Sequence, residues 1–485
     1  MKTPDPRPAR HRPDGRPVRR AAFVSLPIHD GTPYLSAFER LQVRPSIGLR
    51  YLASVLEARG IAVDVLDLMH DPAAAGRIPE RLNARRYDLV GFYMSSASRK
   101  VVLDAASRLD PDWYGGRVLA GGPGAMLHAA EVAGAGIDIV ALGEAEDTIG
   151  LVVDAIAGRR PFADIPGIAY RTADGALRDQ GKAPPVDVAR LPFPSWKDHS
   201  PAFGDMANVT MKRPFFVMLA SRGCPFRCAF CAVPALWECR YRARPVDSVL
   251  DEMQWLVRER GARYIHFIDD VFALAPGWLD AFCDGVRDRG IRVEFSVILH
   301  PSSFRDDRAR SLRRLREAGC RLVSYGAQSA VPEVLRNVHR APSETDELRR
   351  ALPLLHELDV ASVLTYIVGL PGDTLATVRR NLDFACEVKP TLLTFIPILD
   401  LAGSEMVEAM PAAARTRMSP AEIQRFSARG IAHYYFRAGG AARLAAFILR
   451  NNPSWLLNAL PVARFAAAYL PMLGGRGGDW GRQSW

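Results

Sequence analysis

The sequence lacks a long run of apolar residues. No charge-free hydrophobic stretch reaches the roughly 18 residues that a membrane-spanning helix needs. Residues 1–20 are rich in proline and arginine and contain no apolar segment typical of a secretory signal. We therefore expect a cytoplasmic protein that begins with a disordered tail over residues 1–20.

Cysteine is also scarce. The chain has 7 cysteines in 485 residues, too few and too scattered for the disulfide framework of a small secreted protein. Three of them lie close together, at Cys224, Cys228 and Cys231. No second cysteine pair of the kind that completes a zinc site follows them. The scarcity indicates a reducing compartment, and the grouping indicates a metal centre.

Positive charge is concentrated at the two ends of the chain. The net charge is +10, and much of the excess lies in the first 20 residues and near the C-terminus. Hydrophobic residues make up 48% and charged residues 24% of the chain, which are ordinary values for globular proteins. From the length we expect about three domains, and from the charge distribution no nucleic-acid partner.

The three cysteines have CxxxCxxC spacing in the stretch Cys224-Pro-Phe-Arg-Cys228-Ala-Phe-Cys231, just after an apolar run. In a four-iron, four-sulfur (4Fe-4S) cluster each iron normally takes one protein thiolate. Three thiolates leave one iron open, which a substrate or cofactor can chelate, so the spacing favours a reactive cluster. A partial zinc site and unpaired structural cysteines are the alternatives.

Residues 21–160 alternate strand-like apolar runs with amphipathic helical stretches, which predicts an open, parallel, Rossmann-like α/β sheet. Ligands of such sheets bind at the carboxyl ends of the strands. Small or polar residues follow the predicted strands. Residues 25–27 follow the first strand, and later strands are followed by Ser95, Ser96, Gly121, Gly122, Gly143 and Glu144. We expect them to form a cofactor site, although any one alone is also typical of an ordinary strand-to-helix turn.

Residues 161–212 read as a linker with a small hairpin, and a second α/β series covers residues 213–400. It contains six strand candidates, two fewer than a complete β/α barrel has, which predicts a partial (β/α)6 barrel open on one side. The loops after these strands carry the cysteines and then Asp269, Asp270, His300, Gln328, Ser329, Gly369 and Gly372. We expect them at the functional mouth of the barrel.

Residues 401–485 are expected to be helical, with aromatic residues and leucines interleaved with arginines. Such helices can pack on the barrel, cover a substrate, or lie on a membrane surface. The last two readings favour a lipid-like substrate or a peripheral membrane contact.

The order PSIGLRYLASVLEARG, VLAGGPGAMLH and IDIVALGEAEDT resembles the cobalamin-binding domain that precedes many radical SAM enzymes. The DxHxxG signature, in which a histidine binds cobalt from below, is absent, because the stretch from Asp67 to His70 has the wrong spacing. We therefore expect no histidine ligand on cobalt, and His29 and His70 are read as loop residues.

The second series resembles the radical SAM superfamily, and both domains together resemble its cobalamin-dependent branch. The resemblance implies that the three cysteines hold the cluster and that S-adenosylmethionine (SAM) chelates its open iron. It further implies that Phe230 packs on adenine, that Asp269 and Asp270 receive the methionine amino group, that Gln328 and Ser329 touch ribose, and that the loop with Gly369 and Gly372 lies near adenine. It identifies no catalytic side chain.

The resemblance implies transfer of a methyl group from SAM to cobalt and then to an unactivated carbon of a biosynthetic substrate, with two SAM molecules consumed. A reductant such as flavodoxin or ferredoxin would supply the electron. Cyclisation, ring contraction or oxidation without methyl transfer is the alternative among enzymes, and a cobalamin or iron-sulfur sensor is the alternative outside them.

Overall fold

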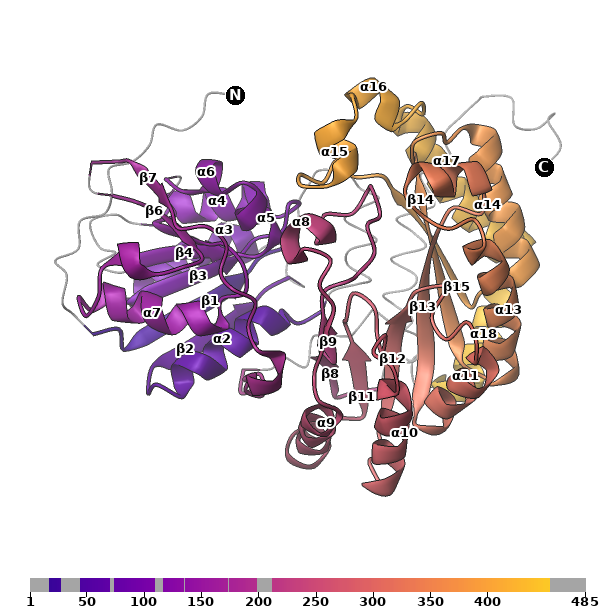
Figure 1. The fold of residues 1–485 in the computed structure, drawn as a ribbon, viewed down its shortest axis with the longest axis horizontal. Helices are drawn as coiled ribbons and strands as arrows, with labels where there is room; N and C mark the ends of the chain where they lie inside the picture. Colours follow the sequence, from indigo (N-terminus) through magenta and orange to yellow (C-terminus); the bar gives the residue numbers. More distant parts are fainter. Residues whose placement is uncertain are drawn as a thin grey trace.

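The fold is described by a computed structural model over residues 17–27, 44–69, 74–109, 117–134, 136–172, 174–198 and 212–453. Two α/β units lie side by side, and helices follow the second unit (Figure 1). His29 and His70 lie outside the described residues, as do most of the tail over 1–20, the linker residues 199–211 and residues 454–485.

The first unit is built on a seven-stranded sheet in the order β2-β1-β3-β4-β5-β6-β7. Its strands are β1 (Arg20–Ser25), β2 (Ala62–Asp67), β3 (Leu89–Tyr93), β4 (Arg117–Gly121), β5 (Ile139–Ala141), β6 (Ile168–Arg171) and β7 (Leu177–Asp179). The first five pair in parallel, as the sequence predicts, whereas β6 and β7 pair antiparallel. Since β6 pairs with β5, part of the segment predicted as a linker extends this sheet.

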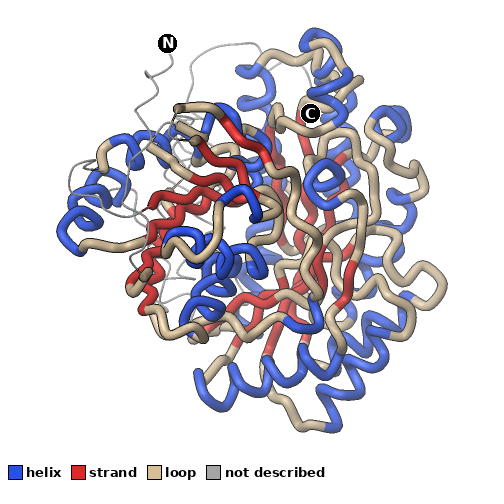
Figure 2. Tube along the Cα trace, turned by 60° about the vertical axis from the view of Figure 1, so that its left-hand side comes forward, coloured by secondary structure: helices blue, strands red, loops and turns tan. Residues whose placement is uncertain are grey.

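Helices cover both faces of the first sheet (Figure 2). They are α2 (Ile47–Glu57), α3 (Ala74–Arg85), α4 (Arg99–Ser107), α5 (Pro123–Leu127), α6 (Ala129–Val132) and α7 (Glu146–Ile156), with short turns η1 (Phe162–Asp164) and η2 (Val188–Arg190) later in the chain. Along β1, Ala22 and Val24 belong to one buried core, and Ala21 and Phe23 belong to the core on the opposite face. A strand buried on both faces explains the continuous apolar run in the sequence.

The second unit is a six-stranded, all-parallel sheet in the order β15-β14-β13-β12-β11-β8. Its strands are β8 (Phe215–Met218), β11 (Tyr264–Phe267), β12 (Glu294–Leu299), β13 (Cys320–Gln328), β14 (Ala361–Val368) and β15 (Leu392–Pro397). The two end strands, β8 and β15, do not pair with each other among the described residues. The predicted partial barrel with an open side is confirmed.

Helices separate these strands in the sequence. They are α8 (Val233–Trp237), α9 (Val246–Arg260), α10 (Trp278–Asp288), α11 (Arg308–Glu317), α12 (Pro332–Asn337), α13 (Glu344–Glu357) and α14 (Leu375–Val388). A separate antiparallel pair, β9 (Ser221–Arg222) and β10 (Arg242–Ala243), lies between β8 and α9. This pair frames the cysteine loop.

The C-terminal helices pack on the barrel. They are α15 (Glu405–Ala409), α16 (Ala412–Arg415), α17 (Pro420–Ala432), the π-helical turn η3 (His433–Arg437) and α18 (Gly440–Asn451). Phe426 of α17 meets Phe395 of β15 edge to face, with ring centroids 5.8 Å apart. Phe447 and Ile448 of α18 share a buried cluster with Leu322, near the start of β13, and with Ala361, the first residue of β14. None of the described helices has the length and apolarity needed to cross a membrane.

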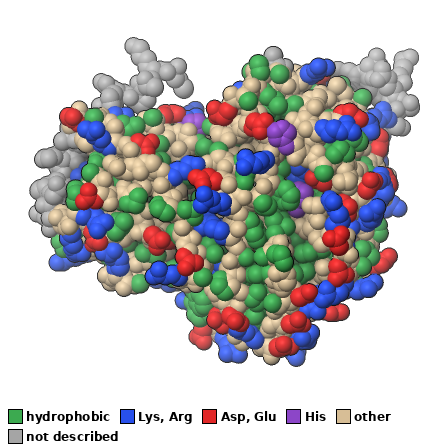
Figure 3. All heavy atoms as spheres, viewed as in Figure 1, with side chains coloured by type: hydrophobic (Ala, Val, Ile, Leu, Met, Phe, Trp, Pro, Cys, Tyr) green, Lys and Arg blue, Asp and Glu red, His purple; other side chains and the backbone are tan. Residues whose placement is uncertain are grey.

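Acidic and basic side chains are interspersed over the visible face of both units (Figure 3). On this face, hydrophobic side chains gather over the centre of the barrel unit. The net positive charge is therefore not collected in one patch on this side of the molecule.

Candidate functional site

The cysteine loop leaves β9 and returns to β10. Arg222 of β9 and Arg242 of β10 are cross-strand partners, so the hairpin closes the loop at its base. Gly223 begins the loop with a φ of 82°, and a Cβ at this position would lie 2.0 Å from the carbonyl oxygen of Arg240. Only glycine fits both the backbone angle and the contact, so the close approach of the two ends depends on Gly223.

The three cysteines of the CxxxCxxC stretch are free thiols at different depths. Cys228 is buried, and Cys224 and Cys231 are half-buried. Burial raises the pKa of Cys224 to about 11 and that of Cys231 to about 12. Charges on Cys228 and on Asp270 also raise the pKa of both thiols, so these groups lie near one another. Binding of iron by these sulfurs therefore has to release their protons.

The loop fits a multinuclear cluster. Among the described side chains, no three His, Cys, Asp or Glu residues converge closely enough to hold a single metal ion. A 4Fe-4S cluster does not require such convergence, because each thiolate binds a different iron. Arg340 supports an anionic centre here, since its Nη1 donates to Cys228 Sγ at 3.8 Å.

Asp269 and Asp270, predicted together, have different surroundings. Asp269 is fully buried after β11 and accepts hydrogen bonds from the Ala220 backbone N–H at 3.1 Å and from the Ser221 hydroxyl. Burial raises its pKa to about 7. Asp270 is exposed as a residue, although burial around its carboxyl raises its pKa, and it accepts from the Gly223 backbone N–H. Asp269 therefore holds the strand that leads into the cysteine loop, and Asp270 is the carboxylate next to the thiols.

Phe230 and the loop after β14 come together. Phe230 is half-buried and packs against a cluster that includes Leu370, the residue after Gly369. Both Gly369 and Leu370 donate backbone N–H bonds to one oxygen of buried Asp373 at 3.0 Å. A Cβ on Gly369 would lie 2.7 Å from Ile423 Cδ1, so a helix of the C-terminal extension packs directly on this loop.

Gly372 is exposed in the same loop with a φ of 92°. A Cβ here would lie 2.6 Å from Asn337 Nδ2, whose amide donates to the Pro371 carbonyl at 2.9 Å. The turn thus requires glycine for conformation and for contact with α12.

Gln328 is the last residue of β13 and Ser329 follows it, but the two side chains have different surroundings. Gln328 is half-buried with a φ of 63°, next to an irregularity in the pairing with β14. Ser329 is buried; its hydroxyl donates to Asn381 Oδ1 at 3.2 Å and accepts from the Val331 N–H at 3.1 Å. The Ser329 hydroxyl already donates its hydrogen bond within the protein, and the Gln328 amide lies against its own strand, since a Cβ on Gly326 would be 2.3 Å from Gln328 Nε2.

A buried network supports the cysteine loop; it brings His300, which was predicted at the mouth of the barrel, together with Arg340 and Glu344, which were not predicted. Arg340 donates to Glu344 Oε2 through Nε at 2.7 Å. Glu344 also lies 3.7 Å from His300 Nε2, and the His300 ring stacks on Phe226 of the cysteine loop with centroids 3.8 Å apart. Burial and the nearby Arg340 charge lower the pKa of His300 to about 3, so the ring is neutral. Arg340 follows a short helix and carries no motif that marks it in the sequence.

The predicted first-domain site residues meet at the carboxyl ends of β3, β4 and β5. Ser95 is half-buried, and its hydroxyl interacts with Ser98 Oγ at 3.1 Å. Ser96 and Gly121 are also half-buried, and a Cβ on Gly121 would touch only the Ala141 methyl group, at 3.5 Å. Small residues with space around them fit the close approach of a large cofactor at this edge.

Gly122 and Gly143 serve the local backbone. Gly122 has a φ of 96°, and a Cβ there would lie 2.8 Å from the Met94 carbonyl oxygen. Gly143 has a φ of 135°, and a Cβ there would lie 3.1 Å from Ala183 Cβ. Both glycines allow tight packing within the first unit.

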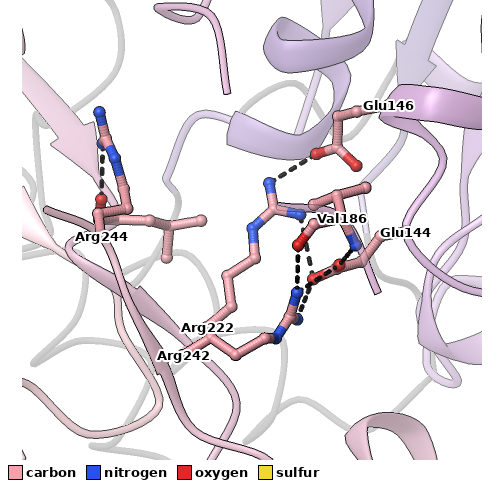
Figure 4. Close-up of polar contacts among 7 residues, drawn as sticks. Glu144, Glu146, Val186, Arg222, Arg242 and Arg244 are labelled. Carbon is pink, nitrogen blue, oxygen red and sulfur yellow. Dashed lines mark hydrogen bonds and ion pairs between the residues drawn. The ribbon is translucent and has the colours of Figure 1, made fainter. Parts of the chain in front are cut away.

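Glu144, predicted as a cofactor contact, points toward the second unit. Its carboxylate is buried and accepts from Arg242 Nη2 at 2.6 Å, from Arg242 Nη1 at 2.9 Å and from the Val186 N–H at 2.7 Å (Figure 4). Burial opposes ionisation, but Arg242 and Arg222 outweigh it and lower the pKa of Glu144. Both carboxylate oxygens are therefore used within the protein.

Family comparisons agree with this geometry. Residues 38–153 match the family model of the B12 binding domain, and residues 218–385 match that of the radical SAM superfamily. The two matches define a class of proteins in which a cobalamin domain precedes a radical SAM domain. The chain belongs to this class and is a cobalamin-dependent radical SAM enzyme, which confirms the resemblance, the fold class and the cofactors: a 4Fe-4S cluster, SAM and cobalamin.

Relatives differ in the reaction that their names give. An uncharacterized methyltransferase of Pyrococcus horikoshii is 26% identical over 386 residues, covering 78% of this chain and 81% of that protein. The anaerobic magnesium-protoporphyrin IX monomethyl ester cyclase of Rubrivivax gelatinosus is 26% identical over 357 residues, covering 72% of this chain and 63% of the cyclase.

The fold is similar to that of the radical SAM methyltransferase TsrM from Kitasatospora setae, solved with cobalamin and a [4Fe-4S] cluster bound. The TM-score is 0.65 at 22% identity, covering 83% of this chain and 80% of that chain. At this identity the comparison establishes the shared fold.

Proposed function

We propose that the enzyme methylates an unactivated carbon of a small biosynthetic molecule, of secondary-metabolite or lipid-like character. The observation that carries this proposal is the contact between the two cofactor units: the turn after β5 of the cobalamin domain meets the hairpin that frames the cysteine loop. When bound, the cluster, SAM and cobalamin supply a carbon-centred radical and a transferable methyl group.

The residues of the chain position these groups and exclude water. We assign Cys224, Cys228 and Cys231 to the cluster, with Arg340 as a cation beside Cys228. Asp270, exposed next to the thiols, is suited to bind an ammonium group, and the half-buried Phe230 offers an aromatic face. The helices α15 to α17 cover this end of the barrel, since Ile423 packs on Gly369 and the Met406 N–H donates to the Ala229 carbonyl at 2.8 Å.

The test is anaerobic reconstitution with SAM, cobalamin and a low-potential one-electron donor such as flavodoxin or ferredoxin. The substrate is sought among metabolites of a host extract. Methylation predicts that S-adenosylhomocysteine and 5′-deoxyadenosine form together and that label from the SAM methyl group enters the product. Formation of 5′-deoxyadenosine without S-adenosylhomocysteine would refute the methyl-transfer proposal.

The second candidate is a radical cyclisation or oxidation, favoured by the likeness to the Rubrivivax cyclase over 72% of this chain. It predicts a product that has lost hydrogen or gained oxygen and carries no carbon from SAM. High-resolution mass spectrometry of the product distinguishes the two candidates.

A further inference from the structure

Two glutamates of the cobalamin domain face two arginines of the radical SAM domain. Glu144 and Glu146 follow β5, and Arg222 and Arg242 come from β9 and β10. Figure 4 shows both arginine side chains reaching toward the glutamates, whereas Arg244, further along the chain, lies apart from them. We call Glu144, Glu146, Arg222 and Arg242 the interdomain clamp.

The contacts of the clamp are specific in geometry. Arg242 binds Glu144 through two nitrogens, at 2.6 and 2.9 Å, and also donates to the Val186 carbonyl at 2.8 Å. Arg222 lies 3.2 Å from Glu144 Oε1 and 2.6 Å from Glu146 Oε1, so it bridges both glutamates. A forked guanidinium that binds two oxygens fixes orientation as well as distance.

The clamp is shielded from solvent, unlike most ion pairs of the described surface. The side chains of Glu144 and Glu146 are 3% and 8% exposed, and those of Arg222 and Arg242 are 12% and 21% exposed. The Arg222 guanidinium also lies over the Tyr51 ring of α2, 5.2 Å from its centroid. Because salt screens buried pairs weakly, the clamp keeps its strength at cellular ionic strength.

The arginines hold the base of the cysteine loop. Arg222 precedes Cys224 by two positions, and its strand partner Arg242 closes the loop on the other side. A second tie lies nearby, since Lys182 Nζ donates to the Ala235 carbonyl at 2.5 Å. Gly403 provides a third, because a Cβ there would lie 2.6 Å from Leu127 Cδ2 and 3.1 Å from Ala235 Cβ.

We propose that the interdomain clamp sets the position of the cysteine loop relative to the carboxyl end of the cobalamin-domain sheet. Its four members are thus positioning residues that hold the two cofactors at a working distance. The proposal rests on the presence of both cofactors and is independent of whether the product is methylated.

The test compares the holoenzyme with Glu144→Gln, Arg242→Met and the milder Glu146→Gln. Pulsed EPR of the reduced cluster and of cob(II)alamin measures the separation of the two paramagnetic centres. We expect one narrow distance distribution in the wild type and a broadened or shifted one in the variants, with the smallest change in Glu146→Gln, and with iron and cobalamin contents unchanged. Product formed per 5′-deoxyadenosine should fall between about tenfold and a hundredfold, as expected for a displacement of about 1 Å.

The matched control is Arg310→Met, which breaks an exposed pair with Asp280 at 3.0 Å. This variant should leave both the distance distribution and the amount of product formed per 5′-deoxyadenosine unchanged. A wild-type distribution in both Glu144→Gln and Arg242→Met would overturn the proposal. Loss of cobalamin from Glu144→Gln but not from Arg242→Met would also overturn it, because Glu144 would then be a cofactor ligand. Absence of a methylated product in the wild type would refute the proposed reaction and leave the distance test valid.

Discussion

At the scale of single residues, the cysteines proposed as cluster ligands have different surroundings from the cysteines elsewhere in the chain. Cys228 is the most enclosed of the three cysteines of the CxxxCxxC stretch and the one in contact with a guanidinium. Cys386 is half-buried on α14, far from the loop in the sequence. The same substitution at the two positions therefore tests the ligand role.

Cys228→Ala should abolish the cluster and SAM cleavage together, because two thiolates hold a 4Fe-4S cluster poorly. Iron and sulfide analysis, the visible absorption of the cluster and release of 5′-deoxyadenosine measure the outcome. Cys386→Ala should retain the iron content and the cleavage rate of the wild type. A Cys228→Ala enzyme that still cleaves SAM would contradict the assignment.

Asp373 offers a prediction for pH dependence. Its pKa is raised to about 6 by burial, although three hydrogen bonds from Gly369, Leu370 and Thr377 favour the ionised form. The ordinary pKa of an aspartate carboxyl, which applies in the unfolded chain, is 3.8. The folded protein therefore binds this proton more tightly than the unfolded chain does. Stability from this group is present at low pH and is lost as the pH rises through about 6.

Asp373→Asn removes this titration. Relative to the wild type, the variant should gain about 1 kcal/mol in the free energy of unfolding between pH 5 and pH 7. Urea denaturation of both proteins at the two pH values measures the change. A difference between them that does not vary with pH would show that Asp373 is ionised throughout this range.

At the scale of elements, sequence patterns were sufficient where the cause is local. The six barrel strands and the five parallel strands of the first sheet follow from apolar runs, and the cysteine loop follows its strand as predicted. Patterns did not reveal partners that are distant in the sequence. Glu144 and Arg242 are 98 residues apart, and the Ser329 hydroxyl is committed to Asn381, which is 52 residues away. Such pairings depend on how whole elements pack.

The C-terminal helix α18 is the element whose role the sequence left most open. Phe447 is 5% exposed and packs with Leu322 near the start of β13, whereas Leu449, two positions later, is 59% exposed. One helix therefore presents both a buried and an exposed apolar residue.

Phe447→Ala should lower the free energy of unfolding by about 3 kcal/mol, because it leaves a cavity. Leu449→Ala should change it by less than about 0.5 kcal/mol, as is usual for an exposed position. Thermal or urea unfolding of both variants measures the difference. Equal effects in the two variants would show that α18 does not pack on the barrel as described.

At the scale of the whole molecule, the two domains share buried contacts. Tyr51 of α2 is fully buried in the same core as Phe216 and Val217 of the barrel strand β8. Its neighbour Arg50 lies over the Trp196 ring at 4.4 Å and donates to the Ser195 carbonyl at 3.1 Å. Unfolding of the cobalamin domain would therefore expose part of the barrel core.

This sharing predicts that cobalamin stabilises both domains. A ligand at a hundredfold its dissociation constant adds about 2.7 kcal/mol to the native state it binds. Hydrogen exchange in the presence and absence of cobalamin should therefore show slower exchange in β11 of the barrel as well as in β3 of the first sheet. Tyr51→Ala should retain the gain in β3 and lose most of the gain in β11, whereas Leu375→Ala, at an exposed position on α14, should retain both. Protection confined to β3 in the wild type would mean that the domains unfold independently, and the buried contacts at Tyr51 would then not couple them.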